Sequence, residues 1–217
     1  MSIDNTRYEF SAITQRPPLR WPNGERLAVW VCYNVEHFKI DVPATSLTEG
    51  LAHLRPDVIN YAWRDYGLRV GMWRLFEMME RLGIKGSSTL NGEVCIHEKP
   101  VVDEMARLGW PILGHGMTNS QQLTNLPEDE ERNVIFDTLD IIERTTGKRP
   151  IGWLGPGLAE SFVTPELLVE AGVKYLCDWV CDDQPFQIKV KTGKLASIPY
   201  TQHIDDIGMI LSSKRSD

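Results

Sequence analysis

Segments typical of strands and helices alternate along almost the whole chain, and this alternation restricts the fold more than any other feature. Apolar runs typical of buried strands are expected at 27–35, 86–91, 110–113, 150–154 and 174–179. Helical patterns lie between them at 72–82, 100–108 and 127–146, and a further helix opens at Thr164-Pro165-Glu166. Such alternation predicts an α/β fold with a parallel sheet, either open or closed into a barrel. No linker interrupts it, so a single domain is expected over residues 1–217, with 1–20 as an N-terminal arm.

Composition and charge narrow the class of partner. The formal net charge of −7 disfavours nucleic acid and anionic membranes, which would repel the chain. No segment approaches the roughly 18 uninterrupted apolar residues of a membrane helix, and the first residues lack the pattern of a secretory signal. The four cysteines lie singly in apolar surroundings, which predicts buried, reduced thiols. We therefore expect a cytoplasmic protein with a small-molecule substrate.

Polar residues gather where the expected strands end. These groups are Asn34/Glu36, Asn91/Glu93, His115/Asn119, Trp153/Pro156 and Asp178/Asp182/Asp183. In a βα barrel these strand ends form one face, on which active sites are built. Polar residues also follow strands in any α/β protein, so the pattern indicates a site without proving one.

Each candidate group has a functional and a structural interpretation. Glu36 and His37 follow the first strand, where a carboxylate can serve as a general base or bind a divalent cation. His115 lies in Gly-His-Gly, which lets the backbone bend sharply and approach a ligand, although a lone histidine is more often structural. Asp182 and Asp183 precede Gln184-Pro185 and could split catalytic roles, hold an arginine or only cap a turn.

Several motifs follow one another in the order seen in a known family. They are YNVEH (33–37), YGLRVGMWR (66–74), GHGMTN (114–119), TGKRPIGWLGPG (146–157), LLVEAGVKY (167–175) and DDQPF (182–186). Together they resemble the polysaccharide deacetylase superfamily, also called the NodB-homology or carbohydrate esterase family 4 group, and most of all its intracellular allantoinase-like branch. The resemblance runs from about residue 21 to 206. It implies a distorted, incomplete (β/α) barrel that hydrolyses carbon–nitrogen bonds other than peptide bonds, often with a divalent metal.

The resemblance also assigns metal positions, and this chain departs from them. Glu36 stands at the position of the ligand carboxylate, and Val35 stands where the family has its base aspartate. His115 matches the first histidine of the family's His-x-x-x-His pair, whereas the second position is Asn119. Only Glu36 and His115 are then good ligands, and a catalytic zinc site normally has three. We expect weak metal binding or none, with zinc the favoured ion if one is bound.

The third family motif usually carries an arginine, and here it begins with Trp153 and continues to Pro156. A tryptophan suits a flat, neutral heterocycle better than a charged sugar chain. We therefore expect a hydrolase that opens a cyclic amide or ureide. Glu36 or a nearby carboxylate would activate water, His115 would protonate the leaving nitrogen, and Asn119 or a backbone amide would hold the oxyanion.

The remaining site residues have supporting roles in this hypothesis. Asp182 and Asp183 would orient the substrate or His115, and the substrate would contact Asn34, His37, Asn119, Trp153 and Pro156. Two alternatives stay open. One is a metal-dependent N-deacetylase of an acetylated sugar or glycan, and the other is a member of the superfamily that only binds a ligand or partner.

The length of the chain also bears on the fold. Relatives continue beyond residue 206, and a closed βα barrel takes about 250 residues. The barrel is expected to be truncated at its C-terminal end. An open barrel exposes apolar strand edges, which predicts a homo-oligomer or poor solubility.

Overall fold

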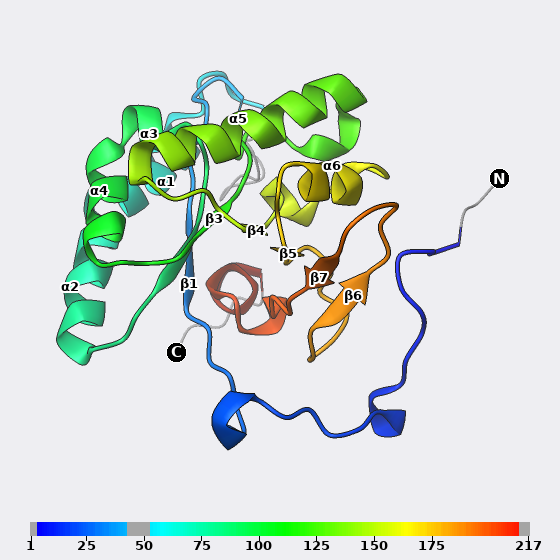
Figure 1. Ribbon diagram of the computed structural model, residues 1–217. Helices are drawn as coiled ribbons and strands as arrows, with labels where there is room; N and C mark the ends of the chain where they lie inside the picture. Colours follow the sequence, from blue (N-terminus) through cyan, green and yellow to red (C-terminus); the bar gives the residue numbers. More distant parts are fainter. Residues whose placement is uncertain (1–3, 43–52, 213–217) are drawn as a thin grey trace.

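The computed structural model describes residues 4–42 and 53–212 and contains one curved, open sheet (Figure 1). The strand order is β1-β2-β3-β4-β5-β7-β6, so β1 and β6 are the two edges. The strands are β1 (Cys32–Val35), β2 (Ser87–Leu90), β3 (Ile112–Gly114), β4 (Gly152–Trp153), β5 (Tyr175–Leu176), β6 (Phe186–Ile188) and β7 (Leu195–Ser197). The sheet does not close, which confirms the prediction of an incomplete barrel.

Strand direction explains why the predicted site residues share one edge. The pairs from β1 to β5 and the β5–β7 pair are parallel, so their carboxyl ends meet on one side of the sheet. The prediction of a purely parallel sheet is corrected by β6 and β7, which form an antiparallel hairpin. Only six residues separate these two strands, too few for the helical crossover that parallel neighbours need.

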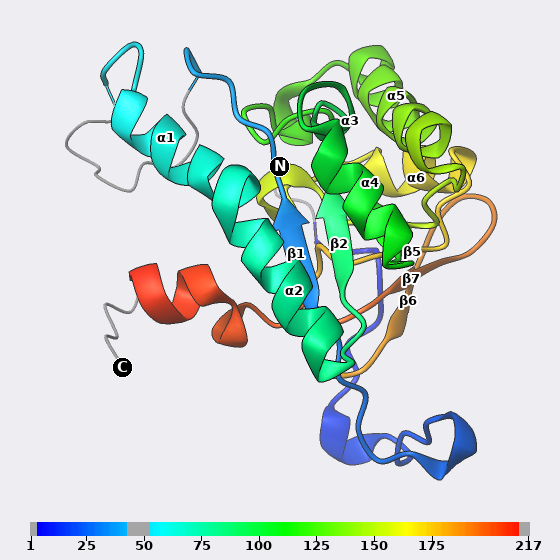
Figure 2. The ribbon, with the colours of Figure 1, turned by 90° about the vertical axis from the view of Figure 1, so that its left-hand side faces the viewer.

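The helices form a layer against one face of the sheet (Figures 1 and 2). They are α1 (Val58–Tyr66), α2 (Met72–Leu82), α3 (Val94–His97), α4 (Lys99–Arg107), α5 (Glu128–Thr146) and α6 (Thr164–Glu170). A wider π-helical turn, Gly67–Gly71, joins α1 to α2. The predicted stripe on α2 is confirmed, since Met72, Phe76 and Met79 are buried and Gly83 ends the helix with a φ of 64°. Burial of this stripe holds α2 over β1 and β2.

The first predicted strand is shorter than its apolar sequence suggests. Leu27 and Val29 are 75% and 79% exposed, and only Cys32–Val35 is β-strand. Within the described residues β1 is an edge strand that pairs with β2 alone, and the pairing starts at Cys32 opposite Ser87. Residues 27–30 precede this pairing and are exposed, so the expectation of a strand at 27–35 buried on both faces was wrong there. Within β1 itself Asn34 is exposed, so this strand is not buried on both faces either.

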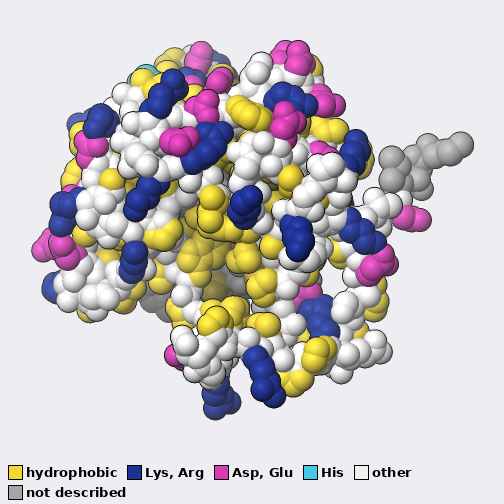
Figure 3. Space-filling view, in the orientation of Figure 1, with side chains coloured by type: hydrophobic (Ala, Val, Ile, Leu, Met, Phe, Trp, Pro, Cys, Tyr) yellow, Lys and Arg dark blue, Asp and Glu magenta, His cyan; other side chains and the backbone are white. Residues whose placement is uncertain are grey.

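The face of the sheet turned away from the helix layer is hollowed. Figure 3 shows hydrophobic side chains gathered in the middle of this hollow. The N-terminal segment runs along the β6 side of the molecule, where the Lys189 N–H donates to the carbonyl of Arg7. Among the described residues, no helix is both long and apolar enough to cross a membrane.

The cysteines follow the sequence expectation only in part. All four are free thiols, and Cys95 and Cys177 are buried. Cys181 is exposed, which corrects the prediction that all are buried. It lies in the loop that follows β5, beyond the part of that segment that packs into the core.

Candidate active site

Glu36 and His115 form the central pair of the candidate site. Glu36 follows β1, His115 follows β3, and the His115 Nε2 lies 3.2 Å from Glu36 Oε1. The other ring nitrogen, Nδ1, lies 2.5 Å from the carbonyl oxygen of Leu154, which can only accept a hydrogen bond. Nδ1 therefore carries a proton, and a second proton between Nε2 and Glu36 completes the pair. Such an arrangement fixes the imidazole and leaves one exchangeable proton, as acid and base catalysis requires.

The glycines around His115 are required by close packing. A Cβ atom on Gly114 would lie 2.7 Å from the ring of Trp153. Gly116 has a φ of +67°, and its Cβ would lie 2.8 Å from Pro156 Cγ. The Gly-His-Gly sequence thus lets β3 lie against Trp153 and lets the chain turn immediately after the histidine. This turn aims the His115 ring at Glu36.

Asn91 fixes the backbones on both sides of the pair. Its amide nitrogen donates to the carbonyl of His115, and its Oδ1 accepts a 2.9 Å hydrogen bond from the His37 N–H. Asn91 is fully buried, so no water replaces these bonds. The Asn119 N–H and the Thr118 hydroxyl also donate to the His37 carbonyl, at 2.9 and 2.8 Å. The loops after β1, β2 and β3 are therefore held as one unit.

A pair of carboxyl groups, Asp178 and Glu160, lies next to this unit. Asp178 is buried after β5 and accepts a 2.6 Å hydrogen bond from the Gly155 N–H through Oδ1. Among the described residues, its buried Oδ2 accepts no hydrogen bond from an amide or hydroxyl donor. Burial, followed by the charge of Asp178, raises the pKa of Glu160 to about 9, so Glu160 holds its proton at neutral pH. A protonated Glu160 can donate to Asp178 and supply the missing bond.

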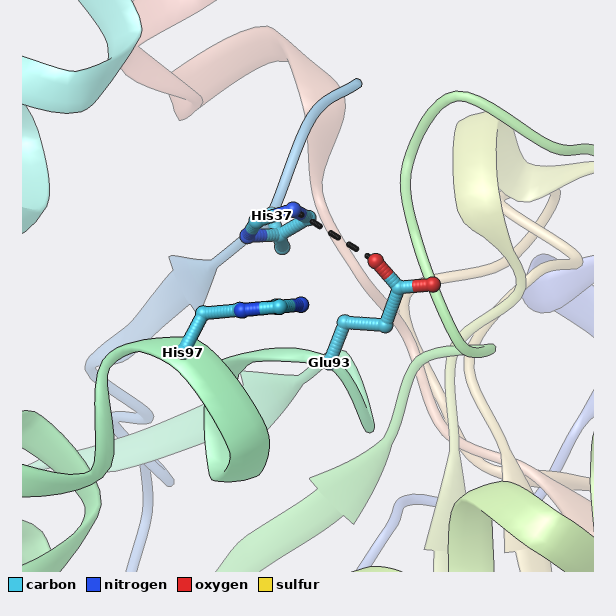
Figure 4. A group of neighbouring side chains, drawn as sticks. All are labelled: His37, Glu93 and His97. Atoms are coloured by element: carbon cyan, nitrogen blue, oxygen red, sulfur yellow. Dashed lines mark ion pairs between the residues drawn. The ribbon is translucent and has the colours of Figure 1, made fainter.

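A second cluster of ionisable groups lies beside the Glu36–His115 pair. His37 Nε2 is 3.4 Å from Glu93 Oε2, and His37 Nδ1 is 3.1 Å from Glu98 Oε1. The rings of His37 and His97 stack with centroids 4.8 Å apart. Lys39 forms an ion pair with Glu93. Figure 4 shows that His37, Glu93 and His97 point toward one another from two separate segments.

The other predicted residues are more dispersed. Asp182 is ion-paired with Arg16 at 2.7 Å and accepts from the Gln184 N–H, and Asp183 is exposed. The contacts of Asp182 thus tie it to the N-terminal segment and to its own turn, and among the described residues none joins it to His115. Asn34 is exposed and donates to the Tyr200 hydroxyl.

The third motif packs into the protein interior. Trp153 is 0% exposed and belongs to a buried core cluster, and Pro156 is also buried. In this structure the indole of Trp153 therefore has no free face to offer a ligand. Its contact with Gly114 shows what it does instead, which is to support the strand that carries His115.

The donor set at Glu36 and His115 does not fit the divalent metal that the fold family implies. These two groups are directly hydrogen-bonded to each other, and the third position is Asn119, whose neutral amide oxygen is a poor zinc ligand. Asn119 Oδ1 is buried without a partner, yet one amide oxygen does not replace an imidazole.

Sequence reasoning did not include five residues among the site residues: Asn91, Glu93, His97, Glu98 and Asp178. Glu93 and His97 are four residues apart, a spacing that places two side chains on one side of a helical turn. That spacing was a signal available in the sequence. No comparable signal in the sequence indicated the role of Asn91, because this role depends on two backbone groups that only the fold brings together.

Comparison with known proteins assigns the fold to a family. Residues 61–176 match the family described as polysaccharide deacetylase. A structure of Puue allantoinase is 23% identical with a TM-score of 0.77, and the match covers 92% of this chain and 70% of that chain. A Pseudomonas aeruginosa PAO1 protein described as a polysaccharide deacetylase is 24% identical with a TM-score of 0.74, with 86% of this chain and 66% of that chain covered.

A third structure agrees with these two. It is a Mycobacterium smegmatis protein, also described as a polysaccharide deacetylase, 23% identical with a TM-score of 0.68, and the match covers 88% of this chain and 65% of that chain. This chain thus spans 65 to 70% of the length of the three structures. No curated protein is similar enough in sequence to count as a match. At these identities the structural likeness shows a shared fold.

Proposed function

Because the chain belongs to the polysaccharide deacetylase family, we propose that it hydrolyses a carbon–nitrogen bond other than a peptide bond and opens a small cyclic amide or ureide. The observation that carries this proposal is the Glu36–His115 pair, 3.2 Å apart at the carboxyl edge of the sheet. The Leu154 carbonyl holds the opposite nitrogen of the ring. Such a pair can supply a general base and a general acid without a bound metal.

In the proposed reaction, Glu36 takes a proton from the attacking water. His115 then gives its Nε2 proton to the leaving nitrogen, because its Nδ1 proton is held by Leu154. Asn119, on the loop tied to His37, or a backbone amide holds the negative oxygen of the tetrahedral intermediate. Asp182 and Asp183 would orient the substrate or His115, as expected from the sequence. For this role Asp182 would have to give up its ion pair with Arg16 in the N-terminal segment.

Two observations favour a small substrate over a glycan chain. A small pocket opens beside the pair and is lined by Glu36, His37, Phe38, Tyr61, Arg64, Asp65 and Glu98. The fold is also shared with a protein named Puue allantoinase, a name that identifies allantoin, a small molecule, as its substrate. We propose that residues 1–217 act as one domain, in a cytoplasmic homo-oligomer, on such a neutral ring.

The test is hydrolysis of a substrate panel by the purified chain, with and without chelator. The panel contains allantoin, cyclic imides and N-acetylated chito-oligosaccharides. Ring opening that survives chelation is expected. Glu36→Gln and His115→Ala should each reduce it by about 10² to 10⁴-fold, the usual contribution of a general acid or base. His203→Ala, which changes an exposed histidine, is the matched control and should retain activity.

Two results would contradict the proposal. Unchanged turnover in both Glu36→Gln and His115→Ala would remove the pair from the reaction. Release of acetate from the oligosaccharides, abolished by chelator, would identify the metal-dependent deacetylase instead.

A further inference from the structure

We propose that His37, Glu93 and His97 form a binding site for one divalent transition metal ion of the zinc type, separate from the Glu36–His115 pair. In the described parts of the chain, these three side chains bring one ligand atom each within 4.8 Å of one another. Two imidazoles and one carboxylate are a ligand set that zinc accepts, with the fourth position open to water. This proposal does not depend on the proposed function, because metal binding is measured without a substrate.

The backbone already places the three ligands on converging paths. Glu93 and His97 are four residues apart at the two ends of the turn that forms α3. His37 comes from the segment after β1, and its position is fixed by the hydrogen bond from its N–H to Asn91. Figure 4 shows the His37 and His97 rings one above the other with the Glu93 carboxylate beside them. Ligands from two rigid segments are therefore preorganised on one side of the α3 turn.

Glu98 supplies a second, independent observation. A histidine that binds a metal through one nitrogen usually donates its other N–H to a carboxylate or carbonyl, which fixes the ring. His37 shows this arrangement, since Nδ1 lies 3.1 and 3.2 Å from the two Glu98 oxygens. Its Nε2 is turned to Glu93. The nitrogen aimed into the cluster is thus the one available for a metal.

Binding requires a small closure and the displacement of one cation. Ligand atoms at zinc bond lengths lie about 3.4 Å apart in a tetrahedron. His37 Nε2 and Glu93 Oε2 already have this separation, and the remaining atoms, now within 4.8 Å, must approach by up to about 1.4 Å. His97 is exposed, which leaves its side chain room to rotate. Lys39 now balances the charge of Glu93, and the metal would replace it there. Lys39 is therefore a competitor whose removal should strengthen binding.

The experiment is calorimetric titration of the full chain, stripped with chelator, using Zn²⁺, together with absorption spectra of the Co²⁺ form. One ion per chain is expected, with a micromolar or tighter dissociation constant. His97→Ala and Glu93→Gln should each weaken binding at least tenfold. Glu98→Gln should weaken it by about 10 to 100-fold, as loss of an outer hydrogen bond does. Lys39→Met should tighten it.

The controls separate this site from the neighbouring pair. His203→Ala removes a histidine of similar exposure outside the cluster and should bind as the original chain does. His115→Ala should also retain metal, because His115 is not a member of the cluster. Circular dichroism checks that each variant is folded. The proposal is overturned if no ion binds below millimolar concentration, or if His115→Ala abolishes binding while His97→Ala keeps it.

Discussion

The proton held by Glu160 predicts an unusual dependence of stability on pH. Its pKa is raised from the ordinary 4.5 to about 9, so between pH 6 and pH 8 the folded chain keeps a proton that the unfolded chain has released. The contribution of Glu160 to the free energy of unfolding is fully present below its ordinary pKa of 4.5, and it is lost as pH rises toward its pKa of about 9 in the folded chain. One proton corresponds to a loss of about 1.4 kcal/mol per pH unit, or about 3 kcal/mol from pH 6 to pH 8.

Glu160→Gln should remove this loss. The glutamine amide can donate to Asp178 as the protonated acid does, but it does not titrate. We expect the variant to unfold with similar free energy near pH 6 and to exceed the original chain by up to about 3 kcal/mol at pH 8. Partial exposure of Glu160 makes this figure an upper value.

The assay is urea unfolding at pH 6, 7 and 8, followed by tryptophan fluorescence, for which the chain has seven reporters. Glu77→Gln on the exposed side of α2 is the matched control and should leave the pH dependence unchanged. If the original chain and Glu160→Gln lose stability in parallel as pH rises, the reasoning about the shared proton is refuted.

Three further changes test how the site is supported. Asn91→Ala leaves the His115 carbonyl and the His37 N–H without partners and should lower the free energy of unfolding by about 2 to 6 kcal/mol, measured in urea. Gly114→Ala places a Cβ against the buried Trp153 and should lower the free energy of unfolding by about 1 to 3 kcal/mol. Gly67→Ala, where the added Cβ meets open space, should instead stabilise α1. Melting temperatures that shift in the same direction in both variants would contradict this. Arg16→Met should lower the free energy of unfolding at pH 7, because the hydrogen-bonded guanidinium lowers the pKa of Asp182. This difference should shrink as pH falls and Asp182 becomes protonated, so a constant difference in urea midpoints would argue against the pair.

The fold was predictable where a pattern repeats within a single element. The stripe on α2 and its closing Gly83 define that helix locally, and the structure has Met72–Leu82. The error at residues 27–31 has a different origin. An apolar run becomes a buried strand only when neighbours cover it. Leu27 and Val29 are exposed and precede Cys32, where the pairing of β1 with β2 starts. Which strands lie side by side depends on the strand order of the sheet, and the hydrophobic periodicity of the sequence does not encode that order.

For the candidate site, the sequence indicated the acidic and basic groups but not the residues that hold them in place. Glu36 and His115 could be placed at strand ends by spacing, and the structure brings them together. The expected ligand surface of Trp153 depended on motif position alone, and packing against Gly114 buries it. Asp178 was visible as a polar residue after a strand, but its pairing with Glu160 required the loop geometry around Gly155.

Two neighbouring residues, Glu36 and His37, connect the proposed catalytic pair to the proposed metal site. Glu36 contacts His115, whereas His37 contacts Glu93 and Glu98, so one short segment serves two different sets of side chains. The backbone of this segment is fixed by Asn91, which also holds His115. A metal at His37 would therefore act on Glu36 through a shared, rigid backbone and not through a shared ligand. Chelation should then change how the pair is positioned, and so the rate, without removing the acid or the base.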